Sequence, residues 1–399
     1  MTRPQLEVSD IFRHHGQQWR EHNQGHINLS QLKIMSAIEN CRTEVLGGHQ
    51  LYCQSCHKTH IAYNSCRNRH CPKCQASSAK RWLEARQAQL LPVDYYHLVF
   101  TLPKEIAEIA YYNKSIMYGL LLKTAAQTLL TIGADEKRLG AKLGVTFVLH
   151  TWGSAMTHHP HVHGIVPGGG LSLDGEKWVS SKSGFFLPVR VLSRLFRRLY
   201  LEKLAEAYQQ NQLVFFGESK SLEDEVSFTQ WLTPLRKKEW VVYAKRPFAG
   251  PKAVFAYLAR YTHRVAISNS RLVKSDEKDV TFRCKNYRAK ASKRYRTMTL
   301  SHGEFIRRFL LHALPSGFQR IRHYGLIANT TCKKNLTKIK GLLNVKVPEV
   351  TTTELVKDKP LQPEQSIVFT CPDCGDPMII RDILICQLKP RAPPIKLVN

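Results

Sequence analysis

The 399-residue sequence has few acidic residues for its length and no long apolar run. It holds 31 Asp and Glu against 59 Lys and Arg, a formal charge of +28, in a chain that is 43% hydrophobic. No stretch approaches the roughly 20 apolar residues that a membrane-spanning helix needs, and residues 1–10 are too polar for a secretory signal. We expect a folded cytoplasmic protein that does not bind membranes and whose positive surface binds nucleic acid.

A motif for binding nucleoside triphosphates is also missing. Gly168, Gly169 and Gly170 follow Pro167, but no Gly-Lys-Ser/Thr sequence comes after them. We expect these glycines to form a turn that ends a strand. The chemistry is therefore expected to proceed without a nucleoside triphosphate.

Cysteine is scarce through the middle of the chain and concentrated towards its two ends. Six of the eleven cysteines fall between Cys41 and Cys74, and Cys371 and Cys374 form a CPDC pair. In a reducing cytoplasm such clusters favour metal over disulfides. The CPDC pair is half of a metal site, and the tail around it offers no clear second pair.

Residues 53–74 contain two CxxC knuckles separated by fourteen residues. Two such knuckles place four thiolates around a tetrahedral Zn²⁺, so the spacing predicts one zinc site. Its predicted ligands are Cys53, Cys56, Cys71 and Cys74. Ligands of the right type for a second zinc are Cys41, His49, Cys66 and His70. The alternative is that Cys66 is a small buried residue and the two histidines are surface side chains.

The period of the apolar residues changes along the chain. Helical spacing occupies residues 5–40 and 77–91, and short apolar runs typical of strands begin near residue 95. Further helices are predicted at residues 189–210, 251–262 and 303–314, with a strand at 240–248 and a hairpin over 264–288. This order predicts a mixed α+β core.

A histidine pair lies on one of the predicted strands, in the sequence HHPHVHGIV of residues 158–166. Successive side chains of a strand alternate between faces, so His161 and His163 share one face while Val162 points to the other. Two imidazoles on one face can hold a divalent metal with open positions. The alternative is a chance cluster in a chain that has 18 histidines.

Two tyrosines, Tyr257 and Tyr261, stand four residues apart on the predicted helix 251–262. Both hydroxyls would emerge from one face, about 6 Å apart along the axis. The alternative is that both tyrosines lie on the buried face of the helix, where aromatic residues four positions apart are also common. Beside a metal-binding histidine pair, however, a tyrosine is a competent nucleophile towards a phosphodiester.

These motifs together resemble a known family. His161-Val162-His163 and Tyr257-Leu-Ala-Arg-Tyr261 resemble the two-tyrosine form of the HUH single-strand endonucleases. The longer sequences SCRNRHCPKC, HHPHVHGIVPGGG, YLARYTHRVAIS and EFIRRFL resemble the transposases of rolling-circle insertion sequences, the insertion-sequence-ninety-one family, from about residue 10 to 335.

The resemblance implies an α+β fold, with an HUH core on a central antiparallel sheet behind an N-terminal zinc-binding domain. It implies a prokaryotic protein, nucleoid-associated during action, that cleaves and rejoins single-stranded DNA at element ends through a 5′-phosphotyrosine. Tyr257 and Tyr261 would be the nucleophiles, and His161 and His163 would hold Mg²⁺ or Mn²⁺. Candidates for a third ligand are His150, His159 and His263.

Three domains are predicted. Residues 1–92 form a helical zinc-binding DNA-recognition domain, residues 93–346 form the nuclease domain, and residues 347–399 form a linker and basic tail with the CPDC knuckle. Residues 280–348 hold sixteen Lys and Arg and one acid, Glu304. This charge is expected of a surface that binds single-stranded DNA. The sequence favours no oligomeric state.

Two other functions fit parts of the pattern. A rolling-circle replication initiator or relaxase would share the histidine pair and the tyrosine chemistry. A non-catalytic zinc-dependent DNA-binding protein would explain the charge and the cysteines, with both tyrosines in a hydrophobic core.

Overall fold

The structure is a computed structural model of the chain, and it describes residues 6–87, 89–182, 184–245, 264–286, 295–345 and 369–387. The chain forms two compact units, one of residues 1–75 with 348–399 and one of residues 76–347. The first boundary, after residue 75, differs from the predicted one at residue 92, whereas the second, after residue 347, is within one residue of the predicted 346. The C-terminal residues 369–387 belong to the N-terminal unit, because they pair with its sheet.

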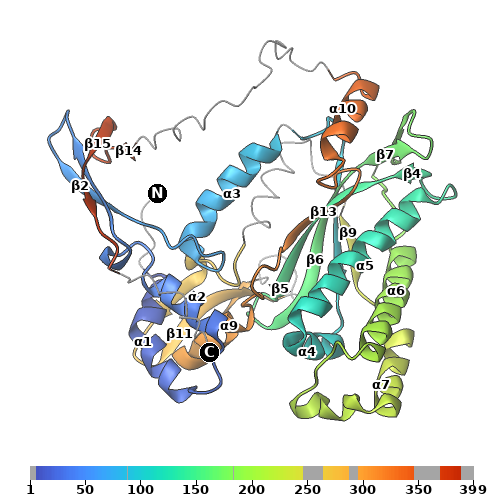
Figure 1. Cartoon of the computed structure of the whole chain (residues 1–399), viewed down its shortest axis with the longest axis horizontal. Coiled ribbons are helices and arrows are strands. Elements are labelled where there is room, and N and C mark those ends of the chain that lie inside the picture. The colour runs from blue at the N-terminus through green and yellow to red at the C-terminus, as the bar shows by residue number, and fades with distance from the viewer. Residues whose placement is uncertain are drawn as a thin grey trace, which may run out of the picture. The chain divides into compact units, whose positions relative to one another are not determined.

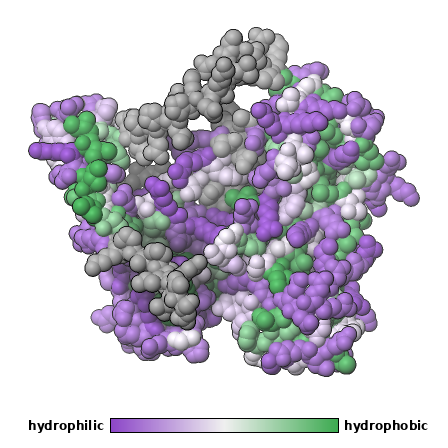
Figure 2. Space-filling model, viewed as in Figure 1, coloured by the Kyte–Doolittle hydropathy of each residue, from purple (hydrophilic) through white to green (hydrophobic). Residues whose placement is uncertain are grey.

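The first unit combines two helices with a four-stranded antiparallel sheet of order β14-β15-β1-β2 (Figure 1). Its elements are α1 (Val8–His22), α2 (Leu29–Glu39), the 3₁₀ turn η1 (Glu44–Leu46), β1 (Gly48–Cys53), β2 (Thr59–Tyr63), β14 (Phe369–Thr370) and β15 (Pro377–Leu384). Asn28 caps α2 by accepting a hydrogen bond from Gln31 N, and Arg20 of α1 pairs with Glu39 of α2 at 2.5 Å. Exposed isoleucines of β15 form the hydrophobic strip at the left of Figure 2.

The second unit is built on a five-stranded antiparallel sheet of order β13-β5-β6-β3-β9. The strands are β3 (Tyr95–Thr101), β5 (Gly144–Trp152), β6 (His158–Pro167), β9 (Val242–Lys245) and β13 (Ile321–Gly325). Two three-stranded sheets accompany it, β4 (Ala141–Lys142), β7 (Gly169–Ser172) and β8 (Trp178–Ser180), and β10 (Leu272–Ser275), β11 (Asp279–Lys285) and β12 (Tyr295–Ser301). The mixed helix and sheet class with antiparallel sheets is as predicted.

Helices pack mainly against one face of the five-stranded sheet (Figure 1). The helices and 3₁₀ turns of this unit are α3 (Pro72–Gln87), α4 (Lys104–Tyr112), α5 (Lys114–Ala134), α6 (Val189–Gln209), η2 (Gly217–Glu223), α7 (Glu225–Lys237), η3 (Asn269–Arg271), α9 (His302–Leu311) and α10 (Cys332–Leu342). α5 contacts β5 and β6, while α6 contacts β9. The predicted helix 251–262 lies outside the described residues.

The alternation of side chains divides the central sheet into two chemically different faces. On β6, Val162 and Val166 enter the large core beneath α5 and α6, and on β5 the residues Phe147 and Leu149 do the same. Because a strand has a period of two, His150, His161 and His163 point to the opposite face. The apolar core thus holds the strands that carry the histidine cluster.

One helix, α5, is long and apolar enough to cross a membrane by length and composition alone. In the described structure 61% of its apolar window is buried, and Leu121, Leu122 and Leu129 belong to the main core. A helix that is apolar on most sides is expected in the centre of a folded unit. α5 is therefore a core helix of the second unit.

Gly164 of β6 is paired with Phe147 of β5, whose ring occupies the space that a side chain at residue 164 would need. A Cβ on Gly164 would lie 2.6 Å from the ring of the buried Phe147. We expect Gly164→Ala to lower the free energy of unfolding by about 1–3 kcal/mol, because the packed ring has little room to move. Urea denaturation measures this change.

Gly119→Ala in α5 is the matched control, since nothing lies within 4 Å of the added Cβ. It should stabilise the protein by up to about 1 kcal/mol, as glycine weakens a helix interior. Equal stability of the two variants would contradict the packing described for Phe147.

Candidate functional site

Three histidines converge on the face of the central sheet that is turned away from the main core. Strands β5 and β6 pair in a register that sets His150 opposite His161 and Val148 opposite His163. A ring nitrogen of each of His150, His161 and His163 lies within 4.8 Å of the others. Of the candidates for a third ligand, the structure thus places His150 with the predicted pair, which brings together three imidazoles on two adjacent strands that could hold a metal.

Two further contacts fix the orientation of the histidine pair. His161 Nδ1 meets the carbonyl oxygen of His159 at 2.7 Å, and His163 Nδ1 meets His97 Nε2 of β3 at 2.8 Å. If His161 donates through Nδ1, its Nε2 is unprotonated, which is the form that binds a metal. His97 supports His163 in the way that outer partners commonly orient a metal-binding histidine.

Burial keeps His161, His163 and the neighbouring His97 neutral. Desolvation lowers the pKa of His161 to about 4 and that of His97 to about 4. It also holds the pKa of His163 well below its usual value, and the neighbouring histidines add to the effect. Neutral imidazoles can coordinate a cation near pH 7, whereas imidazolium cannot.

The other candidate residues are distributed as follows. His159 is exposed on β6 and is not part of the three-histidine cluster, although its ring centroid lies 5.4 Å from that of His161. His158 points elsewhere and contacts Tyr118 Oη and Ala107 O. His263 and both predicted nucleophiles, Tyr257 and Tyr261, lie outside the described residues.

The cysteines of the first unit form two four-thiol clusters, but their grouping differs from the prediction. Cys41, Cys66, Cys71 and Cys74 make one cluster, and Cys53, Cys56, Cys371 and Cys374 make the other. The predicted set of Cys53, Cys56, Cys71 and Cys74 is therefore wrong. The two CxxC pairs that are neighbours in sequence belong to different clusters in space.

Two of the predicted second-site ligands, His49 and His70, belong to neither cluster. His49 lies on β1 with its ring 6.2 Å from that of Phe369. The backbone N–H of His70 donates to Asn68 Oδ1 in the loop before α3. Cys71 and Cys74 take the places predicted for these histidines, with Cys74 Sγ at 3.6 Å from both Cys41 Sγ and Cys66 Sγ.

Comparison with known proteins places this geometry in a family. Residues 144–335 match the family described as "Putative transposase", and residues 11–102 match the transposase zinc-binding domain of IS91. The chain is 52% identical to "Putative transposase y4qJ" of Sinorhizobium fredii over 90% of this chain and 89% of that one. It is 26% identical to the transposase for insertion sequence element IS801 of Pseudomonas savastanoi, over 82% of this chain and 77% of that one.

The chain belongs to the IS91 family of transposases. No solved structure matches it. The transposase match begins at Gly144, the first residue of β5, and so includes His150, His161 and His163. The zinc-binding match includes all six cysteines between Cys41 and Cys74, which agrees with Zn²⁺ in the N-terminal region of this transposase.

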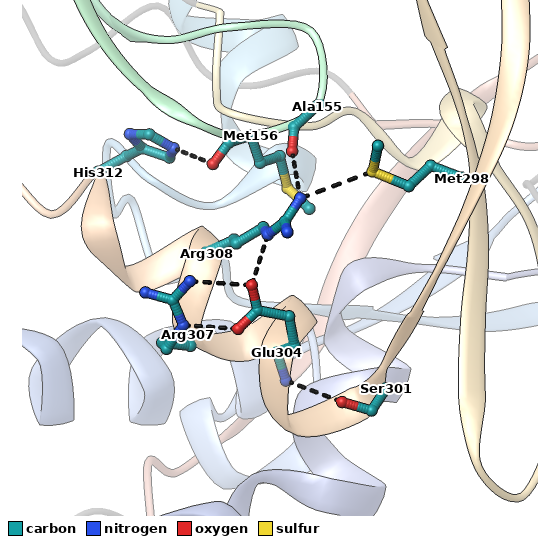
Figure 3. A network of polar contacts seen from close by, with 8 residues as sticks. All are labelled: Ala155, Met156, Met298, Ser301, Glu304, Arg307, Arg308 and His312. Atoms are coloured by element: carbon teal, nitrogen blue, oxygen red, sulfur yellow. Dashed lines mark hydrogen bonds and ion pairs between the residues drawn. The ribbon is translucent and has the colours of Figure 1, made fainter. Parts of the chain in front are cut away.

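In this IS91-family transposase the loop between the two histidine-bearing strands is held by α9 (Figure 3). Arg308 donates to the carbonyl oxygen of Ala155 at 3.2 Å, and His312 Nε2 meets the carbonyl oxygen of Met156 at 3.1 Å. Glu304 fixes Arg308 through a 2.6 Å contact and also pairs with Arg307. These contacts restrain the turn that sets the register of β5 against β6.

The same loop is held from β11 and from the turn before β10. The guanidinium of Arg271 donates to the carbonyl oxygen of Ser154, and Lys285 N donates to Ser154 Oγ at 2.6 Å. We call the contacts of Arg308, His312, Arg271 and Lys285 with residues 154–156 the clamp. The sequence predicts neither this clamp nor the contact of His97 with His163. The run YYHLVF predicts the strand that carries His97, but a single histidine in that strand gives no signal of its partner in β6.

Glu304 should make a pH-dependent contribution to the stability of this clamp. The hydrogen bonds that Glu304 accepts from Arg307 and Arg308 lower its pKa to about 2. A carboxylate whose pKa is lower in the folded state stabilises the fold above its unfolded pKa, and this contribution is lost as the pH falls towards 2. We expect Glu304→Gln to cost about 1 kcal/mol at pH 7 and much less near pH 2.

Chemical denaturation over this pH range measures the difference from the wild-type transposase. Glu202→Gln is the control, because Glu202 makes only an exposed helical pair with Arg198 at 3.6 Å. A pH-independent loss in Glu304→Gln would show that the charge of Glu304 does not stabilise the clamp.

Proposed function

We propose that this transposase cleaves and rejoins single-stranded DNA at the ends of its insertion sequence by tyrosine transesterification, in a rolling-circle type of transposition. The observation that carries the proposal is the cluster of His150, His161 and His163 on adjacent antiparallel strands. An HUH core on the five-stranded sheet is part of the proposal. The family membership supports DNA as the substrate.

The three histidines have the chemistry of a divalent-metal site. Burial keeps His161 and His163 neutral, both are oriented through Nδ1, and three protein ligands would leave coordination positions for water or a phosphate oxygen. We propose that they hold Mg²⁺ or Mn²⁺. When bound, the ion polarises the scissile phosphodiester.

Tyr257 and Tyr261 are the proposed nucleophiles, supported by their spacing and by the resemblance to two-tyrosine nucleases. The phenol oxygen forms a bond to phosphorus while the bond from phosphorus to the 3′ oxygen breaks. The phenol gives up its proton, and the leaving 3′ oxygen gains one. One phosphoester replaces another, so the strand can be rejoined without ATP.

A labelled single-stranded oligonucleotide carrying the element end, incubated with the transposase and Mn²⁺, tests this chemistry. We expect a covalent adduct that survives denaturation and that the double variant Tyr257→Phe, Tyr261→Phe cannot form. Tyr243→Phe, at an exposed tyrosine of β9, should form the adduct as the wild type does.

In the same assay His161→Ala should bind the oligonucleotide but form no adduct, because phosphate contacts dominate affinity. Binding by the wild type without any adduct would favour a non-catalytic zinc-dependent DNA-binding protein. Cleavage of a replication origin in place of the element end would favour an initiator or relaxase.

His97 gives a second test of the proposed metal site. Loss of a residue that orients a metal-binding histidine typically lowers metal affinity by about 10–100-fold. We expect His97→Ala to weaken Mn²⁺ binding by a factor in this range, as measured by electron paramagnetic resonance of the free ion.

His323→Asn is the control for His97→Ala, since His323 contacts Thr146 of β5 and lies outside the three-histidine cluster. Its affinity for Mn²⁺ should match that of the wild type. Unchanged Mn²⁺ affinity in His97→Ala would show that His97 does not position His163 for a metal.

A further inference from the structure

We propose that Cys53, Cys56, Cys371 and Cys374 bind a structural zinc ion that fastens the C-terminal strand to the N-terminal sheet. This zinc would be separate from an ion held by the other four-thiol cluster, that of Cys41, Cys66, Cys71 and Cys74. The zinc-binding match ends at residue 102 and does not reach Cys371 or Cys374. The proposal is independent of the tyrosine chemistry.

The four sulfur atoms are spaced as a tetrahedral zinc requires. Cys53 Sγ lies 3.4 Å from Cys374 Sγ, and Cys56 Sγ lies 3.6 Å from Cys371 Sγ. Four sulfurs at a Zn–S distance of about 2.3 Å stand about 3.8 Å apart at the corners of a tetrahedron. The observed spacing is close to this value, and each CxxC pair faces the other.

The sheet brings the two CxxC pairs to the same end. Cys53 is the last residue of β1 and is paired with Met378 near the start of β15. The other pair lies in the turn between β14 and β15, where Thr370 is paired with Pro377. Two hairpin turns therefore meet edge to edge, with their cysteines between them.

Backbone hydrogen bonds close both turns. Cys53 N donates to Lys58 O at 3.0 Å in the first turn, and Cys371 N donates to Asp376 O at 2.8 Å in the second. Gly375 N also donates to Cys371 O at 2.9 Å. These bonds hold each CxxC pair in a tight turn, the arrangement of a zinc knuckle.

An ion pair ties the turns together beside the sulfurs. Asp373, inside the second CxxC pair, lies 2.8 Å from Lys58 Nζ and 2.7 Å from His60 Nε2. Both partners follow the first CxxC pair in sequence. These contacts align the two turns, and Asp373 Oδ2 also lies 4.0 Å from Cys371 Sγ.

A bound zinc explains the cluster of Cys53, Cys56, Cys371 and Cys374 better than apolar packing or disulfide formation does. Cys374 is exposed, so its position is not explained by burial of a small apolar residue. All four residues are free thiols. A closed set of four cysteine ligands leaves no position for substrate, which makes the expected role structural.

The consequence is that the first unit is complete only when the end of the chain is present. A metal clip between Cys56 and Cys371 closes a loop that contains the whole second unit, and such long-range closures restrict the unfolded chain most. Zinc binding at this cluster would also supply folding free energy to a unit with a small core.

Zinc content per chain, measured on the purified full-length protein by native mass spectrometry, tests the proposal. We expect the double variant Cys371→Ser, Cys374→Ser to hold one zinc fewer than the wild type. Cys386→Ser, on the same C-terminal segment but outside both clusters, should keep the wild-type zinc content. Equal zinc content in the double variant and the wild type would overturn the proposal.

Alkylation of the wild-type protein gives a test that does not depend on folding of a variant. Cys374 and Cys386 are both exposed. With zinc present we expect iodoacetamide to modify Cys386 quickly and Cys374 only after a chelator is added. Equal rates at the two cysteines, or protection of Cys374 that a reductant rather than a chelator removes, would overturn the proposal.

Discussion

The register of β5 against β6 is the constraint on which the candidate nuclease site depends. It sets His150 opposite His161, while the alternation along β6 keeps His163 on the same face. A shift by one residue would turn the histidines into the apolar core and bring Val162 to the other face. The core beneath α5 and the clamp on the connecting loop both restrain this shift. The packing of the core, the geometry of the loop and the proposed metal site therefore all depend on the pairing of β5 with β6.

The first unit depends on a different kind of constraint. Its sheet has only a small cluster of buried residues around Leu51, Cys53, Cys371 and Met378. Small cores stabilise folds weakly, and structural metals commonly supply what is missing. Zinc at the two four-thiol clusters would serve this need, one cluster linking α2 to the start of α3 and the other linking β1 to the turn before β15.

The sequence predicts the parts of the structure that local periodicity controls. Alternation is a local property, so the sequence alone places His161 and His163 on one face of a strand and Val162 on the other. His150 was only one candidate among three, since selecting it requires the pairing register of β5 with β6. His97 gave no signal, because its role depends on a strand that is neighbouring in space and 66 residues distant in sequence.

The zinc ligands show the limit of spacing arguments. The separation of Cys53/Cys56 from Cys71/Cys74 is just short of the usual range for one site, but β1 pairs with β15 and carries Cys53 to the C-terminal knuckle. Cys71 and Cys74 instead join Cys41 and Cys66. Spacing identified the CxxC cysteines as members of four-residue clusters, whereas their partition followed from a strand pairing between residues more than 300 positions apart in sequence.

A crystal structure of the full chain soaked with Mn²⁺, with the ion located by its anomalous scattering, tests most directly whether the three-histidine cluster holds a metal. We expect an anomalous peak bounded by the ring nitrogens of His150, His161 and His163. A well-ordered histidine cluster without a peak, or a Mn²⁺ ion bound only elsewhere in the second unit, would contradict it.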